Sequence, residues 1–281
     1  MKRLFLVFLC VFFSTLSLAH TVKTFMPENN LNEVDGLLID NGMTEELFNS
    51  IIAEVENYYA PIVNGYGADL IINRLWSNST VNAQAYQEGD TWYVDMFGGL
   101  ARRPEVTPDG FAMVVCHEVG HHLAGWPYVQ SWAANEGQSD YFAMHACAKG
   151  IWAKQANKVD SIDPIAKKLC DQNLTSTQDY FLCYREMNAG YSLATLLAAL
   201  GGTKASFSTP DKTIVSKTSS VHPNAQCRLD TYVAGTLCAT VWDDNVIPTT
   251  EAQSAKYLCI NKSSTGYSIQ ARPRCWFKPK I

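Results

Sequence analysis

The stretch Cys116–Pro127, CHEVGHHLAGWP, places His117 and His121 four residues apart in a segment with helical apolar spacing. Residues four apart on an α-helix lie on one face, about one turn from each other. Such a pair can fill two corners of a tetrahedral metal site, but these two histidines alone cannot complete it. The chain therefore needs a fold in which another element approaches this helix with a third ligand.

Glu118 follows the first histidine directly and completes the pattern H-E-x-x-H, the signature of zinc peptidases. Its helical neighbours are apolar, and a charged glutamate among them is costly to bury without a purpose. The sequence therefore favours a site for one zinc ion over a structural histidine cluster. His122 is rotated about 100° from His121, so we expect it to pack and not to bind the metal.

The residues after this helix decide which side chain is the third ligand. A third histidine in the pattern H-E-x-x-H-x-x-G-x-x-H is excluded, because Ala124 and Pro127 occupy the glycine and histidine positions. The segment EGQSD instead places Glu136 and Asp140 on one face of the next predicted helix. We expect Glu136 to be the third ligand, with the fourth corner left to water.

Asp140 is one turn beyond Glu136 and is expected to accept a hydrogen bond from the far nitrogen of His117, fixing its tautomer. The alternative is an acidic, solvated helix face. Ala143 and Cys147 continue this face with apolar side chains, which favours an inward orientation. His145 lies off the face and is expected to be structural.

The remaining patterns indicate an α+β fold. Helical spacing predicts helices over 43–59, ended by Pro61, and over 108–125, 131–155, 177–200 and 223–238. Strands are predicted over 68–76, 80–87 and 91–97, arranged as a small meander. We expect a metal-binding domain over 20–238 and a cysteine-containing extension over 239–281 packed on it.

Residues 1–19 have the pattern of a secretory leader. Lys2 and Arg3 precede a short apolar run, and Ser17–Leu18–Ala19 forms a small-residue cleavage site. We therefore expect cleavage after Ala19, a secreted or periplasmic protein, and no stable membrane insertion. The formal net charge is −5 and no basic block occurs, so nucleic acid is not an expected partner. The oligomeric state cannot be read from the sequence.

Cysteine usage agrees with export. Beyond Cys10, the chain has eight cysteines, an even number that predicts disulfides in an oxidising compartment. The pattern does not fix their connectivity. Cys170 with Cys183, and Cys259 with Cys275, are the local pairs we expect, and Cys116 and Cys147 are candidates for buried free thiols.

Several segments in order resemble one family. HEVGHH followed by EGQSD is similar to the gluzincin arrangement, H-E-x-x-H then E-x-x-x-D. Val81–Leu100 resembles the asparagine–alanine strand and the following strand of the HtpX and CAAX-prenyl-endopeptidase-like zinc metallopeptidases, metallopeptidase family forty-eight. His222–Arg228, HPNAQCR, resembles the later His-Pro…Arg motif of that family. The resemblance spans about residues 45–236 and implies a mainly helical gluzincin core, with a small mixed or antiparallel sheet edging the active-site cleft.

The resemblance also implies an activity and roles for further residues. Together with the chemistry of the motif, it predicts a zinc endopeptidase in which Glu118 is the general base for attack by water. His222 is expected to stabilise the transition state; capping of the following helix and gating of the zinc are the alternatives. Arg228 is expected to orient this loop or to hold the substrate. The strand around Asn82, Ala83 and Ala85 is expected to pair with an extended peptide, although sheet packing explains these side chains nearly as well.

The chain also departs from this family. It has no membrane helices beyond the leader, no helical-repeat partner domain, a short interval between His121 and Glu136, and additional cysteines. The expected partner is thus a peptide or protein substrate, with no implication that it is prenylated. A zinc-bearing chaperone-like or peptide-binding protein with masked or lost peptidase activity is the alternative function. A thermolysin-type gluzincin is a third possibility, disfavoured by the His-Pro motif and the compact length.

Overall fold

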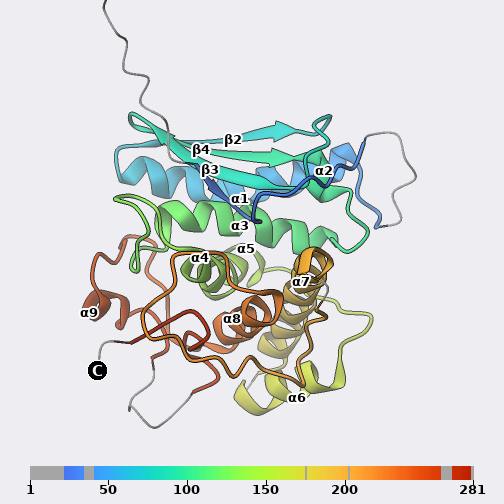
Figure 1. Cartoon of the computed structure of the whole chain (residues 1–281), viewed down its shortest axis with the longest axis vertical. Helices are drawn as coiled ribbons and strands as arrows, with labels where there is room; N and C mark the ends of the chain where they lie inside the picture. The colour runs from blue at the N-terminus through green and yellow to red at the C-terminus, as the bar shows by residue number, and fades with distance from the viewer. Residues whose placement is uncertain (1–21, 35–40, 175, 202, 261–267, 280–281) are drawn as a thin grey trace, which may run out of the picture.

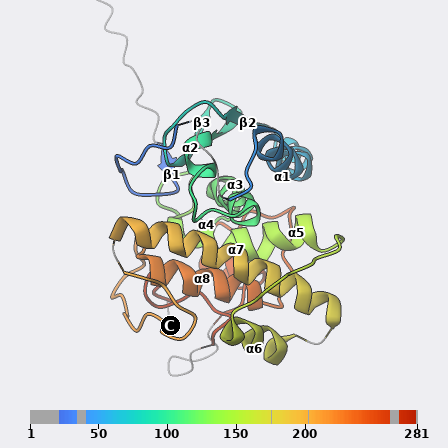
Figure 2. The same ribbon diagram turned by 90° about the vertical axis from the view of Figure 1, so that its right-hand side faces the viewer.

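The computed structural model describes residues 22–34, 41–174, 176–201, 203–260 and 268–279, so the predicted leader lies outside the described residues. The fold is α+β, as predicted. A small four-stranded mixed sheet lies on one side of the molecule, and helices form the rest (Figure 1). Helix α3 (Pro108–Leu123) lies centrally, between the layer of the sheet with α1 (Glu45–Gly65) and a second layer of helices (Figures 1 and 2).

Three strands form where the alternating pattern predicts them: β2 (Asp69–Leu75), β3 (Ala83–Glu88) and β4 (Thr91–Phe97). The predicted meander is wrong, because the strand order is β1-β3-β4-β2 and β2 pairs with β4 in parallel. Strand β4 turns back tightly on β3 at Gly89, whose φ of 59° favours glycine. The outer strand β1 (Lys23–Thr24) was not predicted and pairs antiparallel with β3.

Helix α1 begins close to the predicted start at 43, where the Thr44 side chain caps it by accepting a hydrogen bond from the Leu47 N–H. The predicted end at Pro61 is wrong, since the helix continues to Gly65. The helix continues past Pro61 because Val63, in its last turn, is fully buried and gains apolar contacts. A short helix α2 (Gly98–Ala101) follows the sheet.

The two helices expected to hold the metal differ in how well they were predicted. Helix α3 starts after Thr107, whose side chain accepts a hydrogen bond from the Gly110 N–H, as expected of a cap. Helix α4 (Glu136–Phe142) starts later than the predicted 131, because Asn135 caps it by accepting from the Gln138 N–H. It continues as a π-helical turn η1 (Ala143–Ala148) and as α5 (Lys149–Trp152).

The second helical layer contains α7 (Thr177–Gly201) and α8 (Ala225–Leu237), which lie side by side (Figures 1 and 2). Both were predicted, whereas α6 (Pro164–Asn173) and α9 (Glu251–Ser254) were not. Within the described part of the chain, no helix combines the length and apolar character required to cross a membrane.

Four disulfides link these elements. The pair Cys170–Cys183 is confirmed, but the expected Cys259–Cys275 pair is wrong, since Cys275 bonds Cys227 and Cys259 bonds Cys238. The candidate free thiols Cys116 and Cys147 bond each other. The two cysteines of the C-terminal extension, Cys259 and Cys275, are thereby bonded to opposite ends of α8. In the same extension, the Trp276 ring packs against α4 at Gly137.

Candidate metal centre

Helices α3 and α4 bring three potential metal ligands together. His117, His121 and Glu136 each have at most 2% of their surface exposed, and their ligand atoms all lie within 4.8 Å of one another. His117 Nε2 is 3.4 Å from Glu136 Oε2, and His121 Nε2 is 3.8 Å from Glu136 Oε1. The structure therefore places the three predicted ligands around one point.

The distances fit a single small cation. Ligands about 2.1 Å from a tetrahedral ion are about 3.4 Å from one another. None of the four atoms, the two Nε2 and both Glu136 oxygens, has a hydrogen-bond partner. Buried polar atoms without partners are unfavourable, and a cation among them would satisfy all three side chains. This buried group can hold a metal ion.

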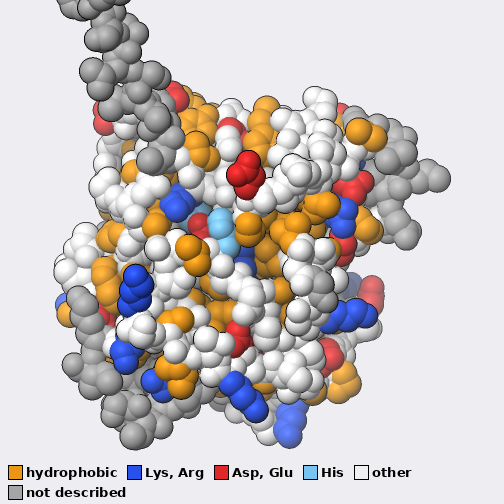
Figure 3. All heavy atoms as spheres, in the orientation of Figure 1, with side chains coloured by type: hydrophobic (Ala, Val, Ile, Leu, Met, Phe, Trp, Pro, Cys, Tyr) orange, Lys and Arg blue, Asp and Glu red, His pale blue; other side chains and the backbone are white. Residues whose placement is uncertain are grey.

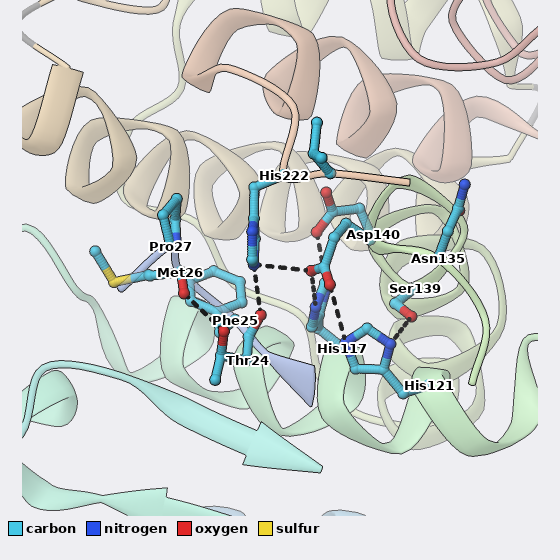
Figure 4. A network of polar contacts seen from close by, with 12 residues as sticks. Thr24, Phe25, Met26, Pro27, His117, His121, Asn135, Ser139, Asp140 and His222 are labelled. Atoms are coloured by element: carbon cyan, nitrogen blue, oxygen red, sulfur yellow. Dashed lines mark hydrogen bonds and ion pairs between the residues drawn. The ribbon is translucent and has the colours of Figure 1, made fainter. Parts of the chain in front are cut away.

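The outer nitrogens of both histidines have acceptors that orient the rings (Figure 4). His117 Nδ1 donates to Asp140 Oδ1 at 2.8 Å, as the spacing predicted. His121 Nδ1 donates to the Ala134 carbonyl oxygen at 2.9 Å and is 3.1 Å from the Ser139 hydroxyl. With the proton on Nδ1, each ring directs the lone pair of Nε2 toward Glu136, the tautomer required of a metal ligand.

Asp140 is in turn held by Arg228 from helix α8. The guanidinium donates to both carboxylate oxygens, from Nε at 2.7 Å and from Nη2 at 2.6 Å, and both side chains are fully buried. Burial opposes the charged form of Asp140, but Arg228, together with His117, keeps the pKa of this carboxyl below its usual value. Arg228 thus orients the histidine through Asp140.

Two features keep α3 and α4 close together. A Cβ on Gly120 would lie 3.2 Å from Ser139 Cα and 3.0 Å from the Phe142 ring, so only glycine fits without a shift. The Cys116–Cys147 disulfide joins the residue before His117 to the turn that continues α4. These contacts fix the separation from which Glu136 reaches the histidines.

Glu118 lies on the same helix and is fully buried, with neither carboxylate oxygen hydrogen-bonded. Burial raises its pKa to about 8. Burial lowers the pKa of His121 to about 3, whereas at His117 the nearby Asp140 and Glu136 outweigh burial and raise the pKa to about 9. Without metal, both His117 and Glu118 therefore bind a proton at neutral pH, and the proton on His117 competes with a cation.

His222 reaches the same centre from the loop before α8. Its Nε2 is 3.4 Å from Glu136 Oε2 and donates to the Thr24 carbonyl oxygen at 2.7 Å. Its side chain is 22% exposed, whereas the other histidines of the described residues are at most 2% exposed. Figure 3 shows histidine atoms at the surface in a hollow of this face, and His222 is the histidine of the described residues with more than 2% of its side chain exposed.

The predicted substrate strand is already paired. Ala83 and Ala85 lie on the edge of β3 that bonds the N-terminal residues, and Asn82 bonds the backbone of Met26. This edge is thus occupied by the chain itself, a contact that sequence reasoning missed.

The other candidates have structural surroundings. His122 stacks between the Trp92 and Trp132 rings and donates from Nε2 to the Tyr93 carbonyl oxygen. His145 donates from Nε2 to the Tyr257 carbonyl oxygen at 2.8 Å. A second group of potential ligands, Asp211 with Cys227 and Cys275, offers no thiolate because its cysteines form a disulfide.

Sequence reasoning missed several backbone and loop contacts at the centre. The Ala134 carbonyl orients His121, and the Asn135 side chain caps α4 while donating to the Ser219 carbonyl oxygen at 2.8 Å, near His222. An asparagine directly before Glu136 is a recognisable cap signal, and it would have placed the helix start correctly.

Comparisons with protein-family models, with curated proteins and with solved structures give no match for this chain.

Proposed function

We propose that this protein is a zinc-dependent endopeptidase. The observation that carries the proposal is the buried convergence of His117, His121 and Glu136, with their facing atoms unpartnered, beside a buried Glu118. Two imidazoles and one carboxylate are the ligand set of catalytic zinc sites that keep one position open. A structural zinc site would have four protein ligands, and the described residues provide no fourth one within the group.

In this proposal His117, His121 and Glu136 hold the zinc. Zinc, when bound, supplies a Lewis acid that polarises a carbonyl and makes water more acidic. Glu118 accepts a proton from the attacking water and later delivers it to the leaving amine. Its burial supports this role, because a raised pKa near neutrality suits a group that both accepts and donates a proton.

His222 is proposed to donate a hydrogen bond to the oxygen on which negative charge develops. Its Nε2 lies at the opening of the site and already donates to a peptide carbonyl, that of Thr24. Arg228 and Asp140 act as positioning residues, because Arg228 holds Asp140 and Asp140 orients His117.

The arrangement supports a place among the gluzincins, near the HtpX and CAAX-prenyl-endopeptidase-like family, with an exported peptide or protein as substrate. Four disulfides agree with a secreted or periplasmic location. The alternative, a zinc-bearing peptide-binding protein with masked activity, is favoured by one observation: the chain's own N-terminal residues occupy the β3 edge.

Cleavage of a peptide library, measured with and without a chelator, tests the proposal. Glu118→Gln should keep one zinc per chain and lose about 10²–10⁴-fold in rate, whereas the exposed Glu46→Gln should change neither. Glu136→Ala should lose zinc on dialysis. A zinc-loaded protein that cleaves no peptide would favour the alternative, and Glu118→Gln with full turnover would refute the role of Glu118.

A further inference from the structure

The edge of β3 next to the metal centre is covered by Val22–Pro27, here called the N-terminal segment. Lys23 lies opposite Ala85, Thr24 lies opposite Gln84, and the Phe25 N–H donates to the Ala83 carbonyl oxygen at 3.1 Å. An extended peptide added to this edge would use the same backbone groups of β3. The segment therefore fills the position that we assigned to a peptide substrate.

The segment also presents a carbonyl to the centre. Alternate residues of an antiparallel strand bond the partner strand, so Thr24, between Lys23 and Phe25, directs its backbone groups away from β3. Its carbonyl oxygen accepts from His222 Nε2, the nitrogen that lies 3.4 Å from Glu136 Oε2 (Figure 4). The Thr24 peptide carbonyl thus accepts a hydrogen bond from His222, the candidate transition-state donor, and lies beside Glu136, the candidate ligand.

The residue after this carbonyl occupies an enclosed slot. The fully buried Phe25 ring meets the edge of His117 at 5.1 Å between centroids, and the Arg228 guanidinium lies 4.3 Å from its face. Arg228 Nη1 donates to the Phe25 carbonyl oxygen at 2.5 Å. Asn82 bonds both backbone groups of Met26, at 2.9 and 3.2 Å. Main-chain bonds and one apolar slot are features of extended-peptide recognition.

We propose that the N-terminal segment is an internal competitor of peptide substrates, bound along β3 in the place and direction of an extended substrate. The proposal rests on the proposed peptidase function. It also defines the substrate class: extended peptides with a large apolar residue directly after the carbonyl that takes the position of Thr24. Substrate and segment cannot pair with the same edge together, so activity requires the segment to leave.

The segment is suited to exchange. Strand β1 has two residues at the edge of the sheet, Lys23 and Thr24 are only half-buried, and Val22 is 41% exposed. Short edge strands open more easily than core elements, so exchange would begin at Val22, Lys23 and Thr24 and would reach the fully buried Phe25 and Met26 last. A pocket of about 840 Å³ borders His222 and is lined by Pro27 and its neighbours, which provides room where a longer peptide would continue.

A binding experiment in the full chain tests the proposal without relying on cleavage. The background is Glu118→Gln with one equivalent of zinc, and the probe is a fluorescein-labelled peptide Val-Lys-Thr-Phe-Met-Pro, followed by anisotropy. Lys23→Pro removes the N–H that pairs with Ala85, whereas Lys23→Ala, the matched control, keeps it. One lost ladder hydrogen bond should make probe binding about fivefold tighter in Lys23→Pro, with Lys23→Ala unchanged.

A second probe with alanine in place of phenylalanine should bind at least tenfold more weakly, because it leaves the Phe25 slot unfilled. Equal affinity of Lys23→Pro and Lys23→Ala for the first probe, with both folded by circular dichroism, would overturn the competition. Equal affinity for the two probes would refute the proposal that the Phe25 slot recognises a large apolar residue. Neither result depends on hydrolysis, so a protein that fails to cleave peptides but binds the probe as expected contradicts only the proposed function.

Discussion

Replacing Asp140 by asparagine tests the link between the buried Arg228 and His117, a candidate metal ligand. Asp140 accepts two hydrogen bonds from Arg228 and one from His117 Nδ1, at 2.7, 2.6 and 2.8 Å. Asparagine keeps the shape but offers one oxygen and directs an NH₂ group at a donor. It also leaves the Arg228 charge, which has no exposed surface, without its anion.

Two separate losses are expected from this substitution. Removing one partner of a buried ion pair costs about 3–5 kcal/mol, which for a chain of this size lowers the melting temperature by roughly 6–20 °C. Loss of the acceptor that orients a metal-bound histidine costs about 10–100-fold in metal affinity. Asp140→Asn should therefore be less stable and should also bind zinc more weakly.

Thermal unfolding with a chelator measures the first loss, and competition with a zinc indicator measures the second. The double variant Asp140→Asn, Arg228→Met serves as control: removing both charges should restore much of the stability while zinc binding stays weak. A melting temperature of Asp140→Asn equal to that of the unaltered chain would refute the charge argument. Unaltered zinc affinity would refute the orienting role of Asp140.

Four further predictions concern the site and the helices that hold it. Because the pKa of His117 without metal is raised to about 9, zinc binding at pH 7 should release at least one proton, and none from this group well above pH 9; calorimetry in two buffers measures this. The raised pKa of His117 also contributes to the stability of the metal-free protein. This contribution is fully present below pH 6.5 and is lost as the pH rises through 9. Gly120→Ala should cost about 1–3 kcal/mol and weaken zinc binding, whereas Gly65→Ala, whose added Cβ meets nothing within 4 Å, should not. Cys116→Ser with Cys147→Ser should lose about 3.5 kcal/mol in denaturant unfolding, since the bridge closes a 31-residue separation.

The candidate metal centre was predictable where its geometry is local. The spacing of His117 and His121, and of Glu136 and Asp140, follows from the helical repeat alone. The structure places these side chains on α3 and α4, facing one another. Both helices are buried on all sides, so their apolar neighbours indicated burial, and the spacing indicated which side chains share a face.

Errors arose where contacts join distant parts of the chain. The expected bond between Cys259 and Cys275 assumed that neighbours in sequence are neighbours in space. The extension instead folds back along α8, so that each cysteine meets a different end of that helix. Strand β1 has two residues and bonds groups about 60 to 200 residues away, and no local pattern marks such a strand.

Arg228 shows why these distant contacts matter for the centre. Through Asp140 it fixes the ring of His117, and through Nη1 it holds the backbone of Phe25. One buried guanidinium therefore joins the candidate metal ligand His117 to the segment that covers the β3 edge. A substrate that displaces Phe25 must offer Arg228 a replacement carbonyl, because an unpaired buried donor is costly. A peptide backbone supplies that group, whereas a ligand without carbonyls does not, and this difference favours peptides as the molecules that exchange with the segment.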